Sequence, residues 1–207
     1  MEEKKNPIFT IGHSTHSLEE FIKLLRIHNV NAVADVRSTP YSRYTPQFNK
    51  DTVEGNLKKH GIKYVFLGRE LGGRSDNPAC FENGRIRFIR LAQTELFRNG
   101  IQRLIQGAQD NRIALMCAEK EPLDCHRTLL VARALVERGV IVGHILANGK
   151  LESYQASIKR LLSILGLSQL DLFRSQEELI KEALALQEEH VAYVSKELSN
   201  NQSGEFL

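Results

Sequence analysis

One short stretch of the chain gathers side chains that can act as nucleophiles, acids and anion contacts. Seven residues separate Cys117 from Cys125, which is followed directly by His126 and Arg127. A cysteine in the first turn of a helix loses its proton readily, and the free amides of a helix start attract anions. Arg127 can add a two-pronged contact to phosphate or carboxylate. The pattern indicates a thiolate nucleophile or an anion-binding loop, although many buried cysteines at helix starts never react.

The same residues also offer metal ligands. Cys117, Cys125, His126 and His13 are side chains of the types that zinc binds. However, common structural zinc sites leave only about two to four residues between paired cysteines. Adjacent residues on a helix, such as Cys125 and His126, also point in different directions. We therefore predict no metal site and keep this ligand set as the alternative.

Two further candidates stand at the ends of apolar segments near the N-terminus. Gly12 allows a ligand to approach the backbone closely, and His13, next to Ser14, can exchange protons near neutral pH. His13 is thus an acid-base candidate, or else a structural histidine held by hydrogen bonds. Arg37 can bind an anion, or it can pair with Asp35, which lies on the same face of the same predicted strand.

The segment after Arg37 interleaves charge with aromatic rings. Arg43 lies between Tyr41 and Tyr44 in a stretch with two prolines. This combination suits phosphate contact and base stacking, although such loops also occur without a ligand. A second long loop, residues 69–87, includes Gly72, Gly73 and Arg74, and long loops of this kind are often functional.

Five short apolar segments alternate with helical patterns along the chain. The predicted strands are residues 8–14, 31–37, 63–68, 112–118 and 140–146. The predicted helices are 18–28, 51–60, one or two within 88–109, and 125–138. Alternation of this kind predicts an α/β fold: a three-layer sandwich with a mainly parallel five-stranded sheet, plus C-terminal helices.

Local signals place several helix ends. The pairs Ser17 with Glu20, Asp51 with Glu54, and Ser175 with Glu178 have the spacing of capping boxes. Asp124 is the expected N-cap of the helix 125–138, and Gly139 its C-terminal glycine.

The order of the strands decides which candidates meet, because ligands bind beyond the carboxyl ends of parallel strands. We expect the order 3-2-1-4-5, which sets strands one, two and four side by side. His13, Arg37 and Cys117 would then face one crevice. A flavodoxin-like order, 2-1-3-4-5, would separate strands one and four.

We divide the chain into an α/β domain, residues 1–150, and a helical extension, residues 151–207, packed on that domain. The last helix carries enough apolar surface to pack on the body or on a second copy, which would make a homodimer. Its apolar residues are Leu179, Ile180, Ala183, Leu184, Val191 and Val194. We expect packing within the chain.

Composition is that of an ordinary folded domain, with 42% hydrophobic and 26% charged residues. Three cysteines are a poor basis for a disulfide framework, and no apolar run could span a bilayer. We expect a cytoplasmic protein without a membrane partner. The last 32 residues carry two lysines and seven glutamates, so the first 175 hold 26 basic against 18 acidic side chains. A basic body suits nucleic acid or a phosphorylated small molecule.

Three motifs carry a resemblance to a known family. They are TIGHST at 10–15, ADVRSTPYSR at 34–43 and MCAEKEPLDCHR at 116–127. The chain resembles the family called domain of unknown function 488 over roughly its first 150 residues. The resemblance implies a site but supplies no activity. The implied positions are His13, Arg37, Pro40, Arg43, Cys117, Glu119, Cys125, His126 and Arg127.

Our first hypothesis is an enzyme, such as a hydrolase or transferase, acting on a phosphate-bearing substrate, either a nucleotide or a nucleic acid. The candidate catalytic residues are His13, Cys117, Glu119, Cys125 and His126. The candidate substrate-binding residues are Ser14, Arg37, Pro40, Arg43, Tyr44 and Arg127. The alternatives are a non-catalytic nucleic-acid-binding module and a thiol redox or metal-binding protein. The sequence names no cofactor.

Overall fold

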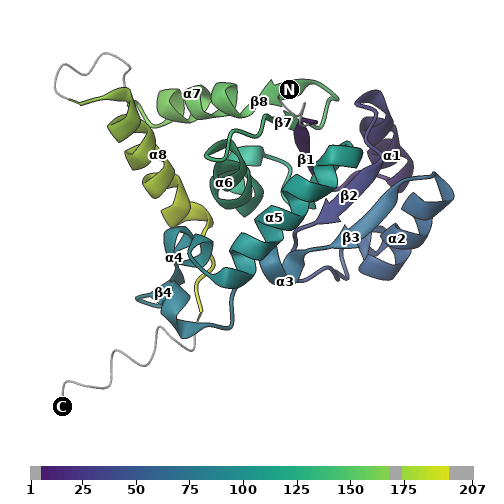
Figure 1. Cartoon of the computed structure of the whole chain (residues 1–207), viewed down its shortest axis with the longest axis horizontal. Helices are drawn as coiled ribbons and strands as arrows, with labels where there is room; N and C mark the ends of the chain where they lie inside the picture. Colours follow the sequence, from purple (N-terminus) through teal and green to yellow (C-terminus); the bar gives the residue numbers. More distant parts are fainter. Residues whose placement is uncertain (1–5, 168–173, 196–207) are drawn as a thin grey trace.

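The computed structural model describes residues 6–167 and 174–195 and is built around a six-stranded sheet (Figure 1). Five strands run parallel in the order β3-β2-β6-β1-β7, and β8 joins β7 antiparallel at the edge. Their bounds are β1 Ile8–Gly12, β2 Ala32–Asp35, β3 Lys63–Phe66, β6 Ile113–Cys117, β7 Val142–Ile145 and β8 Leu151–Ser153. Each predicted strand segment contains one parallel strand, so the α/β class is confirmed.

The strand order differs from the predicted 3-2-1-4-5, because β6, the fourth predicted strand, lies between β1 and β2. All three strands are buried along their whole length, so their hydrophobic patterns do not reveal which is innermost. The short strand β8 was not predicted. The register pairs Gly12 with Cys117 and Asp35 with Met116. Cys117, the last residue of β6, therefore lies between the carboxyl ends of β1 and β2.

Helices cover both faces of the sheet. On one face, α1 (Leu18–Ile27) and α2 (Lys50–Lys59) bury side chains such as Phe21 and Leu57 in a core shared with β1 and β6. The opposite face carries α5 (Glu95–Asp110), α6 (Arg133–Val136) and α7 (Tyr154–Ile164) (Figure 1). The helices of these two layers do not cover the carboxyl ends of the parallel strands, where the loops that form the site lie.

Two of the three predicted capping boxes mark true helix starts. Ser17 accepts a hydrogen bond from the Glu20 amide at α1, and Ser175 and Glu178 form a full box at α8 (Gln176–Val191). The box at residues 51 and 54 is not formed. Instead, a 3-10 turn at residues 46–48 leads into α2 one residue earlier, with Asn49 as the N-cap.

The predicted helix 125–138 begins later than expected. A 3-10 turn, Pro122–Asp124, is followed by Cys125 in extended backbone, with φ −144° and ψ 138°. The wide π turn η4, Arg127–Ala132, then leads into α6. Asp124 is therefore not the N-cap, and its carboxylate accepts a hydrogen bond from Gln187 instead. Gly139, with φ 75°, follows α6 as the predicted glycine.

The predicted loop 69–87 contains regular structure. It begins within α3 (Gly68–Leu71) and includes a hairpin of β4 (Phe81–Glu82) and β5 (Arg85–Ile86). Asn83 and Gly84 have φ values of 50° and 74°, the left-handed pair that a two-residue hairpin turn requires. The hairpin leads into α4 (Phe88–Ala92).

The C-terminal helices lie against the body of the chain. Leu179, Ala183 and Leu184 of α8 are buried in the same core as the sheet face that α5 and α7 cover. The apolar face of α8 is thus packed within the chain. Residues 168–173 and 196–207 of the predicted extension lie outside the described residues. Among the helices that the structure describes, none has the length and apolar character needed to cross a membrane.

Candidate functional site

A cavity of about 320 Å³ opens beyond the carboxyl ends of β2 and β6. Its wall combines the residues after these two strands with the loop after α3, the start of α4 and the segment around the end of α8. The ionisable side chains in the wall are those of Arg37, Arg74, Cys117, Glu119, Asp124, Cys125, His126 and Tyr193. Segments far apart in the sequence thus contribute to one hollow.

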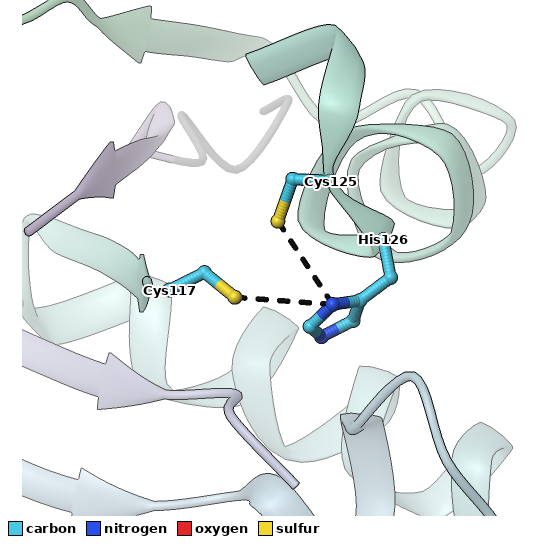
Figure 2. Close-up of side chains that lie close together, drawn as sticks. All are labelled: Cys117, Cys125 and His126. Atoms are coloured by element: carbon cyan, nitrogen blue, oxygen red, sulfur yellow. Dashed lines mark hydrogen bonds between the residues drawn. The ribbon is translucent and has the colours of Figure 1, made fainter. Parts of the chain in front are cut away.

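Cys117, Cys125 and His126 form a compact cluster in this wall (Figure 2). His126 Nδ1 lies 3.8 Å from Cys117 Sγ and 3.9 Å from Cys125 Sγ. The Nδ1 atom and the two sulfurs all lie within 4.8 Å of one another. A regular helix over residues 125–138 would make the side chains of Cys125 and His126 diverge. The extended backbone of Cys125 breaks that helical spacing, so the two side chains converge.

A backbone carbonyl fixes the orientation of the His126 ring. His126 Nε2 lies 3.0 Å from the carbonyl oxygen of Val36, at the end of β2. Because a carbonyl only accepts, Nε2 carries a hydrogen, and Nδ1 faces the sulfurs. The Arg127 amide donates to Cys125 Sγ at 3.4 Å, and Glu119 Oε2 lies 2.9 Å from the same sulfur.

These contacts make the two cysteines unequal. Burial would raise the pKa of Cys125, but a hydrogen bond from Cys117 and the positive charge of Arg127 hold it well below its usual value. Burial and the neighbouring Cys125 raise the pKa of Cys117 well above its usual value. Burial would lower the pKa of His126, but the negative charge of Cys125 raises it. Desolvation and then Cys125 raise the pKa of Glu119. The contacts thus shift the pKa of Cys125 towards the thiolate and the pKa of His126 towards the protonated ring.

Arg127 lies beneath the cavity and not in its wall. Its side chain is fully buried, with 0% exposure. The guanidinium donates to the carbonyl oxygens of Glu119 at 2.7 Å and Lys120 at 3.2 Å. Its hydrogen bonds therefore hold the loop between the two cysteines.

His13 and Arg37 belong to a second buried group. Arg37 forms a two-pronged ion pair with Asp35, at 2.6 and 2.9 Å, and also donates to the Phe48 carbonyl. His13 accepts from Arg37 at 3.2 Å and stacks on the Phe48 ring. Burial and then the positive charge of Arg37 lower the pKa of His13 to about 4, so it is neutral at pH 7. Of this group, only Arg37 reaches the cavity wall.

The other candidates from the sequence lie outside the cavity wall. Arg43 donates to the Tyr44 hydroxyl at 2.7 Å and stacks on its ring, which is 79% exposed. Pro40 is buried and its carbonyl accepts from the Lys50 amide. Ser14, with φ 45°, donates its amide to the Ala118 carbonyl, which ties the end of β1 to the loop between Cys117 and Cys125, called the site loop below.

Arg74 and Tyr193 belong to the cavity wall but were not among the site candidates from the sequence. Arg74 stacks on the ring of Tyr193 at 4.5 Å, and both line the cavity. The glycine pair before Arg74 was a usable signal, because a Cβ on Gly73 would lie only 2.9 Å from His126 Cγ. No sequence pattern marked Tyr193, which follows α8 and meets the site only through the fold.

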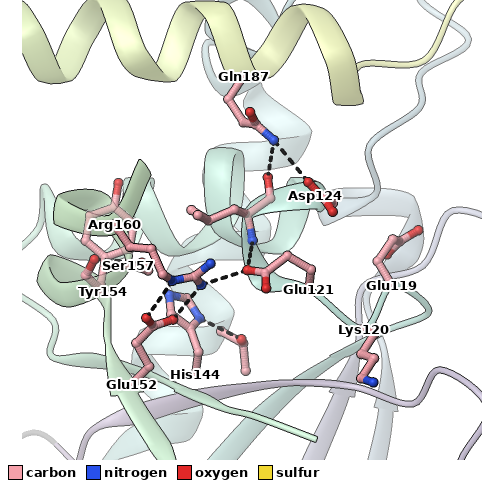
Figure 3. A network of polar contacts seen from close by, with 12 residues as sticks. Glu119, Lys120, Glu121, Asp124, His144, Glu152, Tyr154, Ser157, Arg160 and Gln187 are labelled. Atoms are coloured by element: carbon pink, nitrogen blue, oxygen red, sulfur yellow. Dashed lines mark hydrogen bonds and ion pairs between the residues drawn. The ribbon is translucent and has the colours of Figure 1, made fainter. Parts of the chain in front are cut away.

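The C-terminal helices brace the loop that carries Glu119 (Figure 3). Arg160 of α7 contacts Glu121 at 2.7 Å and Glu152 at 2.9 Å. Gln187 of α8 donates to the Leu123 carbonyl, at 3.1 Å, as well as to the Asp124 carboxylate. The site loop is thus held from below by Arg127 and from the side by α7 and α8.

Comparison with known proteins gives one match. The family described as Domain of unknown function DUF488 matches residues 17–134, more than half of the chain. This range includes both cysteines of the cluster, His126 and the Asp35–Arg37 pair, and it stops before α7 and α8. No curated protein matches the chain, and no solved structure matches it.

Proposed function

Since the chain belongs to the DUF488 family, a domain of unknown function, we propose its activity from the site itself. We propose that the protein is an enzyme that acts on a small phosphate-bearing molecule bound in the cavity beyond β2 and β6. Cys117, Cys125 and His126 are its reaction centre.

One observation carries the proposal: a cluster of two thiols and an imidazole shares a cavity with an arginine. Within residues 6–167 and 174–195, Arg74 stacks on Tyr193 and forms no ion pair with a carboxylate. A guanidinium of this kind can make a two-pronged contact with phosphate. The aromatic and aliphatic side chains of Phe88, Val191 and Tyr193 give the same cavity an apolar side.

The arginines then have different roles. Arg74 contacts the anion, because no carboxylate of the described residues forms an ion pair with its guanidinium. Arg37 and Arg127 support the site, since Arg37 is paired with Asp35 and the two terminal nitrogens of Arg127 donate to backbone carbonyls. His13 is part of the same support, and Glu119 adds a carboxylate beside the thiol of Cys125.

Cavity size favours a small molecule over a polymer. A volume of about 320 Å³ lies at the lower end of the range for small-molecule sites. The Arg43 and Tyr44 pair, which would suit nucleic acid, is exposed and outside the cavity wall. The non-catalytic nucleic-acid-binding module therefore ranks second.

The test is turnover of a panel of phosphomonoesters, phosphodiesters and nucleotides by the full chain with reduced thiols. Cys117→Ser, Cys125→Ser and His126→Asn should each lower turnover by about a hundredfold or more, as expected for members of a reaction centre. Cys80→Ser, which changes the buried cysteine outside the cluster, is the matched control and should retain turnover.

Three outcomes would count against the proposal. Turnover that survives all three cluster variants would remove the cluster from the chemistry. Absence of both turnover and saturable binding across the panel would contradict the phosphate-bearing substrate. Salt-dependent binding of oligonucleotides that is lost in Arg43→Ala and Tyr44→Ala, but not in the cysteine variants, would favour the binding module.

A further inference from the structure

We propose that Cys117 Sγ, Cys125 Sγ and His126 Nδ1 bind one zinc ion in the wall of the cavity. The inference deepens the proposed function by assigning a cofactor to its reaction centre. Zinc binding can nevertheless be measured without any substrate, so the two proposals can fail separately.

The spacing of the three atoms suits a tetrahedral ion. Zinc bound to thiolate at about 2.3 Å and to imidazole at about 2.0 Å sets its ligand atoms about 3.5 to 3.8 Å apart. The two sulfurs lie 3.8 and 3.9 Å from His126 Nδ1, and every pair of the three atoms is within 4.8 Å. Movements of less than about 1 Å, within the reach of side-chain rotation, would close this triangle around the ion.

The surroundings already hold the ligands in the orientation that a metal needs. The Val36 carbonyl accepts the hydrogen of His126 Nε2, which leaves Nδ1 as the ligand atom. Such a hydrogen bond on the far nitrogen is the usual partner of a metal-binding histidine. The Arg127 amide donates to Cys125 Sγ, as amides commonly do to coordinated sulfur.

Charge is also balanced. Two thiolates cancel the charge of a zinc ion, so the loaded cluster buries no net charge of its own. This matters because both cysteines are almost fully buried, at 1% and 2% exposure. A divalent ion without two anionic ligands would be costly at this depth.

The ligand count points to a reactive ion. Structural zinc sites normally have four protein ligands, whereas catalytic sites have three and leave the fourth position to water or substrate. All three proposed ligands line the cavity, so an ion between them borders the space assigned to the substrate. The Glu119 carboxylate, 2.9 Å from Cys125 Sγ, stands next to that position. A phosphate oxygen in the cavity could take the same position.

The experiment uses the full chain, treated with a chelator and with its thiols reduced and counted. Cobalt(II), which takes the same geometry, is added first and is then displaced by zinc. We expect one equivalent to bind, with the sulfur-to-cobalt absorption of a thiolate site and the visible bands of a tetrahedral ion. Competition with a chromophoric chelator then gives the zinc affinity.

Variants identify the ligands. Cys117→Ser and Cys125→Ser should each lower zinc affinity by about a hundredfold or more, whereas Cys80→Ser should leave it unchanged. Zinc affinity that both cluster variants retain would overturn the proposal. If either variant fails to fold, the wild-type cobalt spectrum decides, since absence of thiolate absorption at one equivalent also overturns it.

The two proposals give separable results. A protein that binds no zinc but needs its cysteines for turnover contradicts the zinc site and leaves the proposed function in place. A protein that binds zinc through these ligands but neither binds nor turns over the phosphate panel supports the zinc site and contradicts the proposed function.

Discussion

The carbonyl oxygen of Glu119 lies 1.8 Å from the point that a Cβ on Gly12 would occupy. The end of β1 is also hydrogen-bonded to the start of the loop that carries Glu119, since the His13 amide donates to the Cys117 carbonyl at 2.9 Å. Only a residue without a side chain lets the loop fold over the strand end at this distance. Gly12 therefore shapes the site through the backbone that carries Glu119.

Gly12→Ala should displace this loop and damage the site. Because the clash is with backbone, relief requires the loop itself to move, and we expect a loss of about 1 to 3 kcal/mol in the free energy of unfolding. Urea denaturation measures the change. Gly55→Ala in α2 is the control, since its new Cβ meets nothing within 4 Å and should stabilise the helix by up to about 1 kcal/mol. Equal effects of the two changes would refute this role of Gly12.

Stability should depend on pH through His13. Its pKa is about 4 in the folded protein, against 6.5 as the ordinary value. The unfolded chain therefore binds the proton first, and the contribution of neutral His13 is present above pH 6.5 and lost as the pH falls towards 4. The lowered pKa of His13 corresponds to a loss of about 3 kcal/mol in the free energy of unfolding between pH 6.5 and pH 4.

The test compares unfolding free energies of the wild type and His13→Gln between pH 7 and about pH 4. The variant keeps an acceptor for Arg37 but cannot take up the proton, so its curve should be flatter. His60→Gln, at an exposed position, should follow the wild type. Parallel curves for wild type and His13→Gln would contradict the argument. Burial lowers the pKa of His144 to about 3, so His144 also makes the unfolding free energy fall with falling pH, and it does so in all three proteins.

Arg160→Gln should loosen the site loop without unfolding the domain. The change removes the ion pairs that tie Glu121 to α7 and β8. Amide hydrogen exchange at residues 119–124 should accelerate, while exchange in the central strands stays slow. Arg133→Gln, which removes an exposed pair with Glu137, should leave exchange in the loop unchanged. Unaltered exchange at residues 119–124 in Arg160→Gln would show that α7 does not brace the loop.

Arg74→Ala should weaken substrate binding more than the chemical step. We expect KM for a phosphate-bearing substrate to rise by about ten- to a hundredfold, the loss of a charged hydrogen bond, with a smaller change in kcat. Arg69→Ala, an exposed arginine outside the cavity wall, is the control. A fall in kcat at constant KM would assign Arg74 to the reaction itself.

Much of the fold could be predicted because its signals are local. Apolar segments marked the parallel strands, and Ser175 with Glu178 marked the start of α8. The position of β6 could not be predicted, since it depends on long-range pairing among three equally buried strands. The box at Asp51 failed because the preceding turn at residues 46–48 decides where α2 begins.

Part of the site could be predicted because its residues, too, can be recognised from local sequence signals. Cys117, Cys125 and His126 stand out by residue type and do lie together. The sequence did not predict that the three side chains converge on one point. This convergence depends on the extended backbone of Cys125, whereas the sequence predicted a regular helix there. Tyr193 approaches Arg74 only after α8 has packed on the body, so no local pattern could reveal that contact.

X-ray absorption at the zinc edge of the loaded protein tests most directly whether the two thiols and the imidazole act as one centre. For zinc bound by Cys117, Cys125 and His126 we expect two sulfur neighbours at about 2.3 Å and a histidine nitrogen at about 2.0 Å, together with one light atom in the fourth position. A shell made only of oxygen and nitrogen neighbours would contradict this expectation.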